Sequence, residues 1–520
     1  MAQDPLIDAP PGEPTPTHSY LAPPQPLRRG VPIGLRPGPS DRPLAPSALG
    51  IVEQPADRRV VAAAIASGAV VDLALRHSGP TLACAVAPMI LGAALLATGR
   101  LRTRASQICS VIAFAPASLL ALRTDAVLGV VATLAAAALL ALAASLGREG
   151  NVADLSFPQV AQRAALLCGH GMVGLGFAGR AVSGAMGSRR DGARRAARGL
   201  AIAVPIVGVL GVLLASGDAV VAGLLGTLSA GRVLGHVALI GVGAALAAGL
   251  ARAASSSVPP LRRWRHVGRG EARWVLGSVV AALGAFTVVQ IVVAVGGARH
   301  VLADAGITYA DHARSGFFQL LGAAAFVAVV VLTTRAVTDR GGEDRVLAWL
   351  GAVASLLTAV IAGSAVARLR LYENAFGLTL LRVWAMAGAL MIAGVALVIA
   401  ARLASAGARP WTTAAVLSVA LAGVLALGIV GPVDLVARRN LARAEQGKSL
   451  DAGYLVELGP DAIPAIEGAL PRISAGIQTD VRSRLCAHSP DGAAGGFLEA
   501  NLARHRAERS LRRVCATSPR

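Results

Sequence analysis

The polar residues best suited to chemistry in this chain lie in a short stretch between two long apolar runs. The stretch RLRLYENAFGLTLLR, residues 368–382, contains Tyr372, Glu373, Asn374 and Arg382. If the flanking runs cross a membrane, these side chains lie at its surface or inside it, where ionisable groups cost free energy unless they are paired. The stretch is therefore a candidate functional site.

The spacing within this stretch suggests a local ion pair. Thr379 is a good N-cap for a helix that begins at Leu380. Arg382 then falls in the first turn, where the positive end of the helix dipole repels a cation. A nearby carboxylate would stabilise Arg382, and Glu373 is the natural partner.

Counting of predicted spans places further polar residues on the same face. Two spans separate loop 297–315 from loop 367–378, so both loops lie on one side of the membrane in either orientation. Asp218 falls on that side by the same count, and Asp311 can cap the helix that follows it. The predicted polar cluster comprises Asp218, Tyr309, Asp311, Arg314, Tyr372, Glu373 and Arg382.

Three interpretations of this cluster stay open. The simplest is that its members are paired anchors that fix helix ends at the membrane surface. The second is a site for a ligand or an ion, and the third is an acid–base catalytic pair.

Motifs for known chemistry are missing from the sequence. It contains no P-loop, HExxH, GxSxG or CxxC pattern. His300, Asp304, Asp311 and His312 match no metal-ligand spacing. We therefore expect no catalytic residue, no metal and no cofactor. Asp72 and Gln290 stand alone in apolar runs, and each is expected to bond to a neighbouring helix.

The elements that must position the cluster are membrane-spanning helices. Hydrophobic residues make up 55% of the chain and charged residues 15%, against about one quarter charged in soluble domains. Residues 126–147 carry no charge over a length that can cross the hydrocarbon core. We predict an all-α polytopic bundle of eleven spans, at 60–77, 79–98, 107–122, 126–147, 199–217, 233–251, 275–296, 316–334, 346–366, 379–402 and 411–430.

Orientation follows from two arginine-rich loops, 180–198 and 252–273, which should face the cytoplasm. A short apolar segment at 164–179 fits this orientation only if it does not cross, so a re-entrant or interfacial role is favoured. The N-terminus is then cytoplasmic, and the protein lies in the cytoplasmic membrane.

The two ends of the chain differ from the predicted membrane domain, 58–430. Residues 1–57 hold fourteen of the 28 prolines and are typical of a disordered tail. Residues 431–520 are polar, and 433–446 and 497–514 have the periodicity of amphipathic helices. Asp461 is expected to begin a short helix with Pro464 in its first turn. This helical tail could bind a protein partner.

The net charge and the cysteines bear on the expected partners and on the compartment of the tail. The net charge of +20 comes almost wholly from arginine, because Lys448 is the single lysine, and it is banded between apolar runs. This pattern argues against nucleic-acid binding and leaves the lipid bilayer as the expected partner. Cys486 and Cys515 could pair if the tail lies outside the cytoplasm, but two free thiols are the simpler expectation.

Four segments resemble one bacterial family. They are PIVGVLGVLLASGDAVVAGLL (205–225), ITYADHARSGFFQLL (307–321), RLRLYENAFGLTLLRVW (368–384) and PVDLVARRNLARAEQGKSLDAGYLVELGPDAIPAI (432–466). The family is a multi-pass membrane domain of unknown function, numbered four-one-seven-three. The resemblance implies a polytopic protein with an appended helical tail and no established activity.

The function that these observations favour is non-enzymatic. We expect a structural, sensory or partner-binding component of the cell membrane. A transporter of a small solute or lipid is the alternative, and a membrane-embedded enzyme is the third possibility.

Overall fold

The computed structural model describes residues 56–76, 80–185, 229–259, 267–295, 317–338, 344–405, 411–487 and 497–516, together with single positions at 199, 203, 206, 207 and 210. The long segments all belong to one compact unit, Pro43–Arg520. Regular structure in these segments is helical, apart from an isolated bridge between Val267 and Thr338. The predicted all-α class is confirmed.

Helices account for ten of the eleven predicted spans, and the span predicted at 199–217 lies outside the described segments. Seven described helical stretches are long and apolar enough to cross a membrane, with α3 and α4 counted as one, and Leu82–Ala97 and Gln319–Arg335 are shorter apolar helices. The membrane-domain helices are α1 (Arg58–Leu75), α2 (Leu82–Ala97), α3 (Arg104–Ile112), α4 (Phe114–Leu122), α5 (Ala126–Ser145), α6 (Phe157–Ala185), α9 (Ser229–Ser255), α10 (Arg269–Val295), α13 (Phe317–Val337), α14 (Arg345–Phe376), α15 (Leu380–Ala404) and α16 (Thr412–Val430), with the 3-10 turn η1 (Val152–Asp154).

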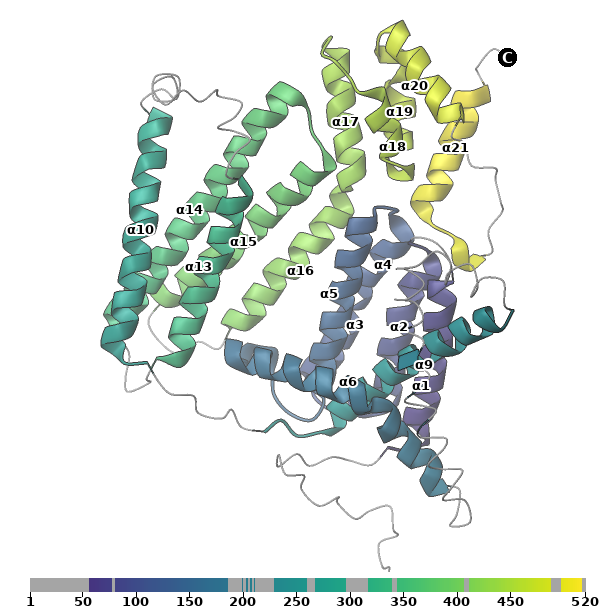
Figure 1. Ribbon diagram of the computed structural model, residues 1–520, viewed down its shortest axis with the longest axis vertical. Coiled ribbons are helices and arrows are strands. Elements are labelled where there is room, and N and C mark those ends of the chain that lie inside the picture. The colour runs from purple at the N-terminus through teal and green to yellow at the C-terminus, as the bar shows by residue number, and fades with distance from the viewer. Residues whose placement is uncertain are drawn as a thin grey trace, which may run out of the picture. The chain divides into compact units, whose positions relative to one another are not determined.

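These helices pack as two groups joined by α16. A first bundle contains α1–α6 and α9, and a second contains α10 and α13–α15 (Figure 1). Each has an apolar core of its own, around Leu95 and Phe177 in the first bundle and around Leu276 and Val331 in the second. Helix α16 packs against α15 on one side and against α4 and α5 on the other.

The connections gather at two opposite ends of the helices. At one end, which we call the basic end, Arg148 donates to the carbonyl of Ser255 (3.0 Å) and the amide of Arg102 donates to Gly147 (2.7 Å). At the other, the cap end, lie the α4–α5 connection, the α14–α15 connection and the end of α16. Arg123 joins two of these places, because its guanidinium donates to the carbonyls of Gly428 and Ile429.

Helix α6 contains the segment 164–179, for which a re-entrant or interfacial role was expected. The segment is part of one continuous helix of 29 residues, and α6 is not among the described helices apolar enough to cross. It packs across the last turns of α9, where Gly174 approaches the backbone of Gly249 so closely that a Cβ would lie 2.5 Å from its nitrogen. Helix α6 therefore lies at the basic end, and the interfacial role of the segment stays a prediction.

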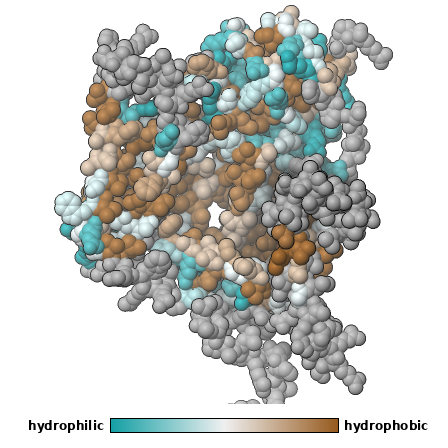
Figure 2. Space-filling model, in the orientation of Figure 1, coloured by the Kyte–Doolittle hydropathy of each residue, from teal (hydrophilic) through white to brown (hydrophobic). Residues whose placement is uncertain are grey.

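The C-terminal residues Pro432–Ala516 form a helical cap. It contains α17 (Pro432–Glu445), α18 (Ala452–Glu457), α19 (Ile463–Ala469), α20 (Ala475–Ala487) and α21 (Leu502–Ala516), with the 3-10 turns η2 (Pro460–Ala462), η3 (Leu470–Arg472) and η4 (Phe497–Glu499). Its own core includes Leu441, Leu455, Ile466 and Val481. Figure 2 shows hydrophilic residues gathered over the cap and hydrophobic residues over the bundles.

A disulfide links α20 to α21 within the cap. Cys486 and Cys515 are bonded, with their Cα atoms 5.8 Å apart. The expectation of two free thiols was wrong, because a pattern of two isolated cysteines does not reveal that helix packing brings them within bonding distance.

Candidate functional site

The stretch that carries the candidate residues is a helix end followed by a tight elbow. Helix α14 continues to Phe376, so the loop predicted at 367–378 is wrong for all but its last two residues. Arginine, leucine, tyrosine and glutamate are all compatible with a helix, and the first breaker is Gly377, whose φ of +85° other residues rarely adopt. The elbow comprises Gly377, Leu378 and Thr379, and α15 begins at Leu380 as predicted.

Arg382 lies over an aromatic ring at this elbow. Its guanidinium carbon is 4.2 Å from the ring centre of Tyr372, and its Nη1 donates to the carbonyl of Gly377 (2.5 Å). Both residues are described, and no ion pair joins Arg382 to Glu373. The predicted pairing is therefore replaced by a cation–π contact and a bond to the free carbonyl end of α14. Thr379 is the N-cap residue of α15, but its side chain makes no capping bond.

The cap holds the elbow through three side chains. Asn440 accepts from the amide of Leu378 (2.9 Å) and donates to the carbonyl of the same residue (2.7 Å). Tyr454 Oη accepts from the amide of Leu380 (2.9 Å). Arg443 donates to the carbonyls of Glu373 (3.2 Å) and Asn374 (2.6 Å), which end α14. We call Asn440, Arg443 and Tyr454 the elbow anchor.

A second set of contacts holds the cap to the first bundle. Asp461 accepts from the amide of Thr124 (2.6 Å) and from its hydroxyl, and lies 3.7 Å from Arg123. Asn501 Nδ2 lies within hydrogen-bond distance of the carbonyls of Pro80 (3.2 Å), Leu120 (3.0 Å) and Arg123 (3.0 Å). We call Asp461 and Asn501 the bundle anchor.

A short helix was expected to begin at Asp461 with Pro464 in its first turn. The helix is present and Pro464 lies in its first turn, but Asp461 does not cap it. Asp461 lies inside the turn η2, and α19 begins at Ile463 with no side-chain cap. The carboxylate instead accepts hydrogen bonds from Thr124, 337 residues away in the chain, in a partly buried contact.

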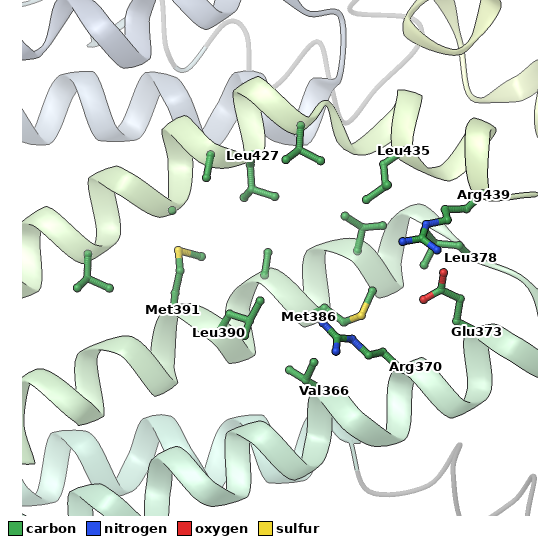
Figure 3. A pocket seen from close by; sticks show the side chains of 16 residues that line it. Val366, Arg370, Glu373, Leu378, Met386, Leu390, Met391, Leu427, Leu435 and Arg439 are labelled. Atoms are coloured by element: carbon green, nitrogen blue, oxygen red, sulfur yellow. The ribbon is translucent and has the colours of Figure 1, made fainter. Parts of the chain in front are cut away.

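A pocket of about 430 Å³ lies beside the elbow, between α14, α15, α16 and α17 (Figure 3). Most of its lining is apolar. The lining residues are Val366, Arg370, Glu373, Leu378, Val383, Met386, Ala387, Leu390, Met391, Val419, Gly423, Ala426, Leu427, Val430, Leu435 and Arg439.

The charged lining of the pocket is confined to the end nearest the cap. Arg370 and Glu373 come from the last turns of α14, and Arg439 comes from α17 (Figure 3). Within the described segments, the side chains of both arginines form no hydrogen bond or ion pair. Two guanidinium groups and one carboxylate give this end an excess of one positive charge.

The apolar part of the pocket reaches deep into the second bundle. Met391 and Val419 line it, each eleven residues from the cap end of its helix. At 1.5 Å per residue this depth is about 16 Å. The hydrocarbon core of a bilayer is about 30 Å thick, so this depth is close to the thickness of one leaflet.

The predicted cluster can be followed only in part. Asp218, Tyr309, Asp311 and Arg314 lie outside the described residues, as do His300, Asp304 and His312. Tyr372, Glu373 and Arg382 lie at the cap end. Of these three, Glu373 lines the pocket, whereas Tyr372 and Arg382 contact each other.

Isolated polar residues inside the helices bond to neighbours, as expected. Asp72 lies 2.8 Å from His236 of α9 and pairs with Arg76, and Gln290 accepts from Arg368 of α14. Among the described residues, no three His, Cys, Asp or Glu side chains are arranged to hold a metal ion.

Sequence reasoning missed Arg370, Arg439 and the elbow anchor. Arg370 stood in the quoted stretch without a role, and Asn440 and Arg443 stood in the polar positions of an amphipathic pattern. No periodicity pairs residues more than sixty positions apart. The one available signal was that both segments belong to the four that carry the family resemblance.

Comparisons with known proteins lead to a family of undefined activity. No curated protein and no solved structure matches the chain. A family described as Domain of unknown function (DUF4153) matches residues 108–469, which include the elbow, the pocket and the elbow anchor. The resemblance had suggested a family of unknown function with a different number, four-one-seven-three. The match covers more than half of the sequence, and the chain belongs to the DUF4153 family.

Proposed function

We propose that this protein is a sensory or partner-binding component of the cell membrane that binds an anionic amphiphile in the pocket beside the elbow. The observation that carries the proposal is the division of the pocket into an apolar part and an end with two arginines, whose side chains form no hydrogen bond or ion pair within the described segments. A phospholipid-like molecule has the same division, with an acyl chain and an anionic headgroup.

The dimensions of the pocket support this ligand class. Small-molecule sites enclose about 300–1,000 Å³, and the volume of about 430 Å³ falls in that range. A depth close to one leaflet suits an acyl chain that keeps its headgroup at the membrane surface. Met386 and Met391 in the wall can adjust to chains of different shape, because methionine is flexible and unbranched.

Charge supports an anionic headgroup. Arginine binds phosphate and carboxylate groups with paired hydrogen bonds, and Arg370 and Arg439 reach the pocket from two different helices. A phosphate between them would join α14 to α17. Glu373 would accept a hydrogen bond from a headgroup hydroxyl at the same end.

A sensory role is supported by the position of α17, which serves both the pocket and the cap. Leu435 and Arg439 line the pocket. Asn440 is hydrogen-bonded to the backbone of Leu378, and the side chain of Leu378 lines the pocket. Leu441, the next residue of α17, lies in the core of the cap. A ligand that draws Arg439 toward Arg370 would therefore tighten the cap on the elbow.

Two features support an extracytoplasmic cap and a cytoplasmic N-terminus. The arginine-rich loop 252–273 starts at the basic end, opposite the cap, and positive loops face the cytoplasm. The cap also contains the disulfide Cys486–Cys515, and disulfides persist in oxidising compartments. Asp57 precedes α1 and lies 3.8 Å from Arg100, at the basic end.

Photo-crosslinking of the purified protein in nanodiscs tests the ligand. The probe is a lysophosphatidylglycerol with a diazirine in its acyl chain, compared with its phosphatidylcholine counterpart. We expect crosslinks to peptides that contain Met386 and Met391, with the anionic probe giving several-fold more product. Equal labelling by the two probes, or labelling elsewhere, would contradict the proposal.

Matched variants make the test specific. Arg439→Gln should lower the crosslinking several-fold, whereas Arg438→Gln, one residue along α17 and paired with Asp434 (2.9 Å), should not. Ala426→Phe should fill the pocket, and Ala420→Phe on the same helix lies outside its lining.

The alternative function, transport of the same amphiphile, separates from sensing in proteoliposomes. A transporter would move a fluorescent phosphatidylglycerol between leaflets, and Arg439→Gln would slow the movement. A sensor binds the lipid without accelerating its transfer over protein-free vesicles, which is the outcome that we expect.

A further inference from the structure

We propose that the start of α21 and the turn before it form a second lipid contact, specific for the anionic headgroups of the bilayer at the cap end. We call residues 497–509 the foot. In this proposal Phe497 and Leu502 enter the membrane interface, and Arg506 and Arg509 bind lipid phosphates. The inference is independent of the pocket beside the elbow.

The foot is tied to the place where apolar helices begin. The carbonyl of Ala500 accepts from the amide of Leu82, the first residue of α2, at 2.9 Å. Asn501 lies within hydrogen-bond distance of Pro80 and of Leu120, near the end of the span Arg104–Leu122. These contacts place the foot at the level of the headgroups.

The foot presents apolar side chains on an otherwise polar cap. Phe497 is 82% exposed, and Leu498 and Leu502 are each 38% exposed. Large exposed apolar side chains that lie together mark a contact surface, and Phe and Leu are among the residues that interfacial amphipathic helices bury at the membrane surface.

Beyond these residues, α21 separates into an apolar side and a basic side. Ala503, Ala507 and Leu511 are buried against the cap. Arg506 and Arg509 are exposed, three residues apart on the other side, and within the described segments their side chains form no hydrogen bond or ion pair. Glu508 is the single acid of this helix. Arginines beside an interfacial aromatic residue fit phosphate groups of an anionic leaflet.

Tryptophan fluorescence in nanodiscs tests the insertion. A Phe497→Trp variant should be quenched by phosphatidylglycerol brominated near the headgroup, after subtraction of the quenching of the five native tryptophans. Thr479→Trp is the control, because Thr479 is exposed on α20, which lies in the cap away from α4 and α5 (Figure 1). We expect at least twofold more quenching at position 497 than at 479.

A change of headgroup tests the specificity. The emission of the Phe497→Trp variant should lie at shorter wavelength in phosphatidylglycerol discs than in phosphatidylcholine discs. Adding Arg506→Gln and Arg509→Gln should remove this difference, whereas adding Arg472→Gln, which neutralises an exposed arginine elsewhere on the cap, should preserve it.

Two outcomes would overturn the inference. Equal quenching at positions 497 and 479 would show that the foot lies outside the membrane, so that its exposed apolar residues belong to a protein contact. Emission that is the same in both kinds of disc would show that the arginines do not recognise headgroup charge.

Discussion

The cap is held at two places, and the two anchors differ in burial and in what lies next to them. In the bundle anchor, Asp461 and Asn501 are 7% and 4% exposed and bond to the connections of the first bundle. In the elbow anchor, Asn440 and Tyr454 are only partly buried and bond to the backbone beside the pocket.

This difference indicates two roles. Breaking a buried polar contact leaves groups without water or a partner, so the bundle anchor is costly to open. The elbow anchor is closer to solvent and shares Leu378 with the pocket wall, so it can respond to a ligand. We infer that the cap pivots on the bundle anchor while the elbow anchor tightens or loosens.

The largest expected loss of stability comes from a change beside the bundle anchor. The disulfide closes a loop of 29 residues and holds α21, which begins directly after Asn501. Replacing both cysteines with serine should lower the stability of the cap by about 3–4 kcal/mol in the chain-entropy account. The loss is measured as a shift in the thermal unfolding midpoint of the cap, with limited proteolysis as the readout. An unchanged midpoint would mean that α21 is held by packing alone.

Asn501→Ala should have the next largest effect. It removes an amide nitrogen within hydrogen-bond distance of three carbonyls and the acceptor for the amide of Ala503 (3.0 Å), and the contacts with Leu120 and Ala503 are buried. We expect a loss of about 2–3 kcal/mol. Denaturant unfolding of the cap measures the loss. A smaller loss than that caused by Asn440→Ala would reverse the order of the two anchors.

Asn440→Ala should destabilise the protein less, by about 1–2 kcal/mol, because it removes two hydrogen bonds at a partly exposed place. Its effect should be local, with faster hydrogen exchange at Leu378 and little change around Asn501. Arg438→Gln on the same helix is the control. Equal acceleration at both anchors would contradict the idea that they open separately.

The smallest expected effect is the pH dependence of stability caused by Asp125, which lies close to Asp461 of the bundle anchor. Burial, and secondly the charge of Asp461, raise the pKa of Asp125, which caps α5 through the amide of Leu128 (3.0 Å). A raised pKa means that the folded protein holds the proton of Asp125 more tightly than the unfolded chain does. The resulting stabilisation is fully present below the unfolded-state pKa and is lost as pH rises through the folded-state pKa.

Asp125→Asn keeps a good N-cap without the charge. The variant should therefore be more stable than the wild type at pH 7, by less than about 1 kcal/mol after solvent screening. The gain should vanish as pH falls and Asp125 becomes protonated. Unfolding midpoints at pH 4, 5.5 and 7 measure it, and a gain that is constant with pH would contradict the burial effect.

The sequence predicted what depends on local pattern. Apolar runs predicted eleven described helices as ten spans, with α3 and α4 in one span, and amphipathic periodicity predicted α17 and most of α21. The end of α14 was misplaced because the polar residues after position 366 were taken for a loop, although nothing in them opposes a helix.

Long-range contacts could not be predicted in this way. Asp461 looks like a helix cap until its distant partner Thr124 is known, and Glu373 looks like the partner of Arg382 until the contact of Arg382 with the ring of Tyr372 is known. The pocket depends on how four helices pack, which no spacing records. Burial and partner choice are properties of the assembled fold.

Hydrogen exchange at the elbow tests the central claim that the pocket and the cap are coupled. The amides of Leu378 and Leu380 donate to the elbow anchor, so their exchange reports its closure. Adding lysophosphatidylglycerol should slow their exchange several-fold in the wild type and in Arg438→Gln, but not in Arg439→Gln. Exchange at the bundle anchor should stay the same. Crosslinking of the lipid in the pocket with no change in exchange at the elbow would contradict the coupling.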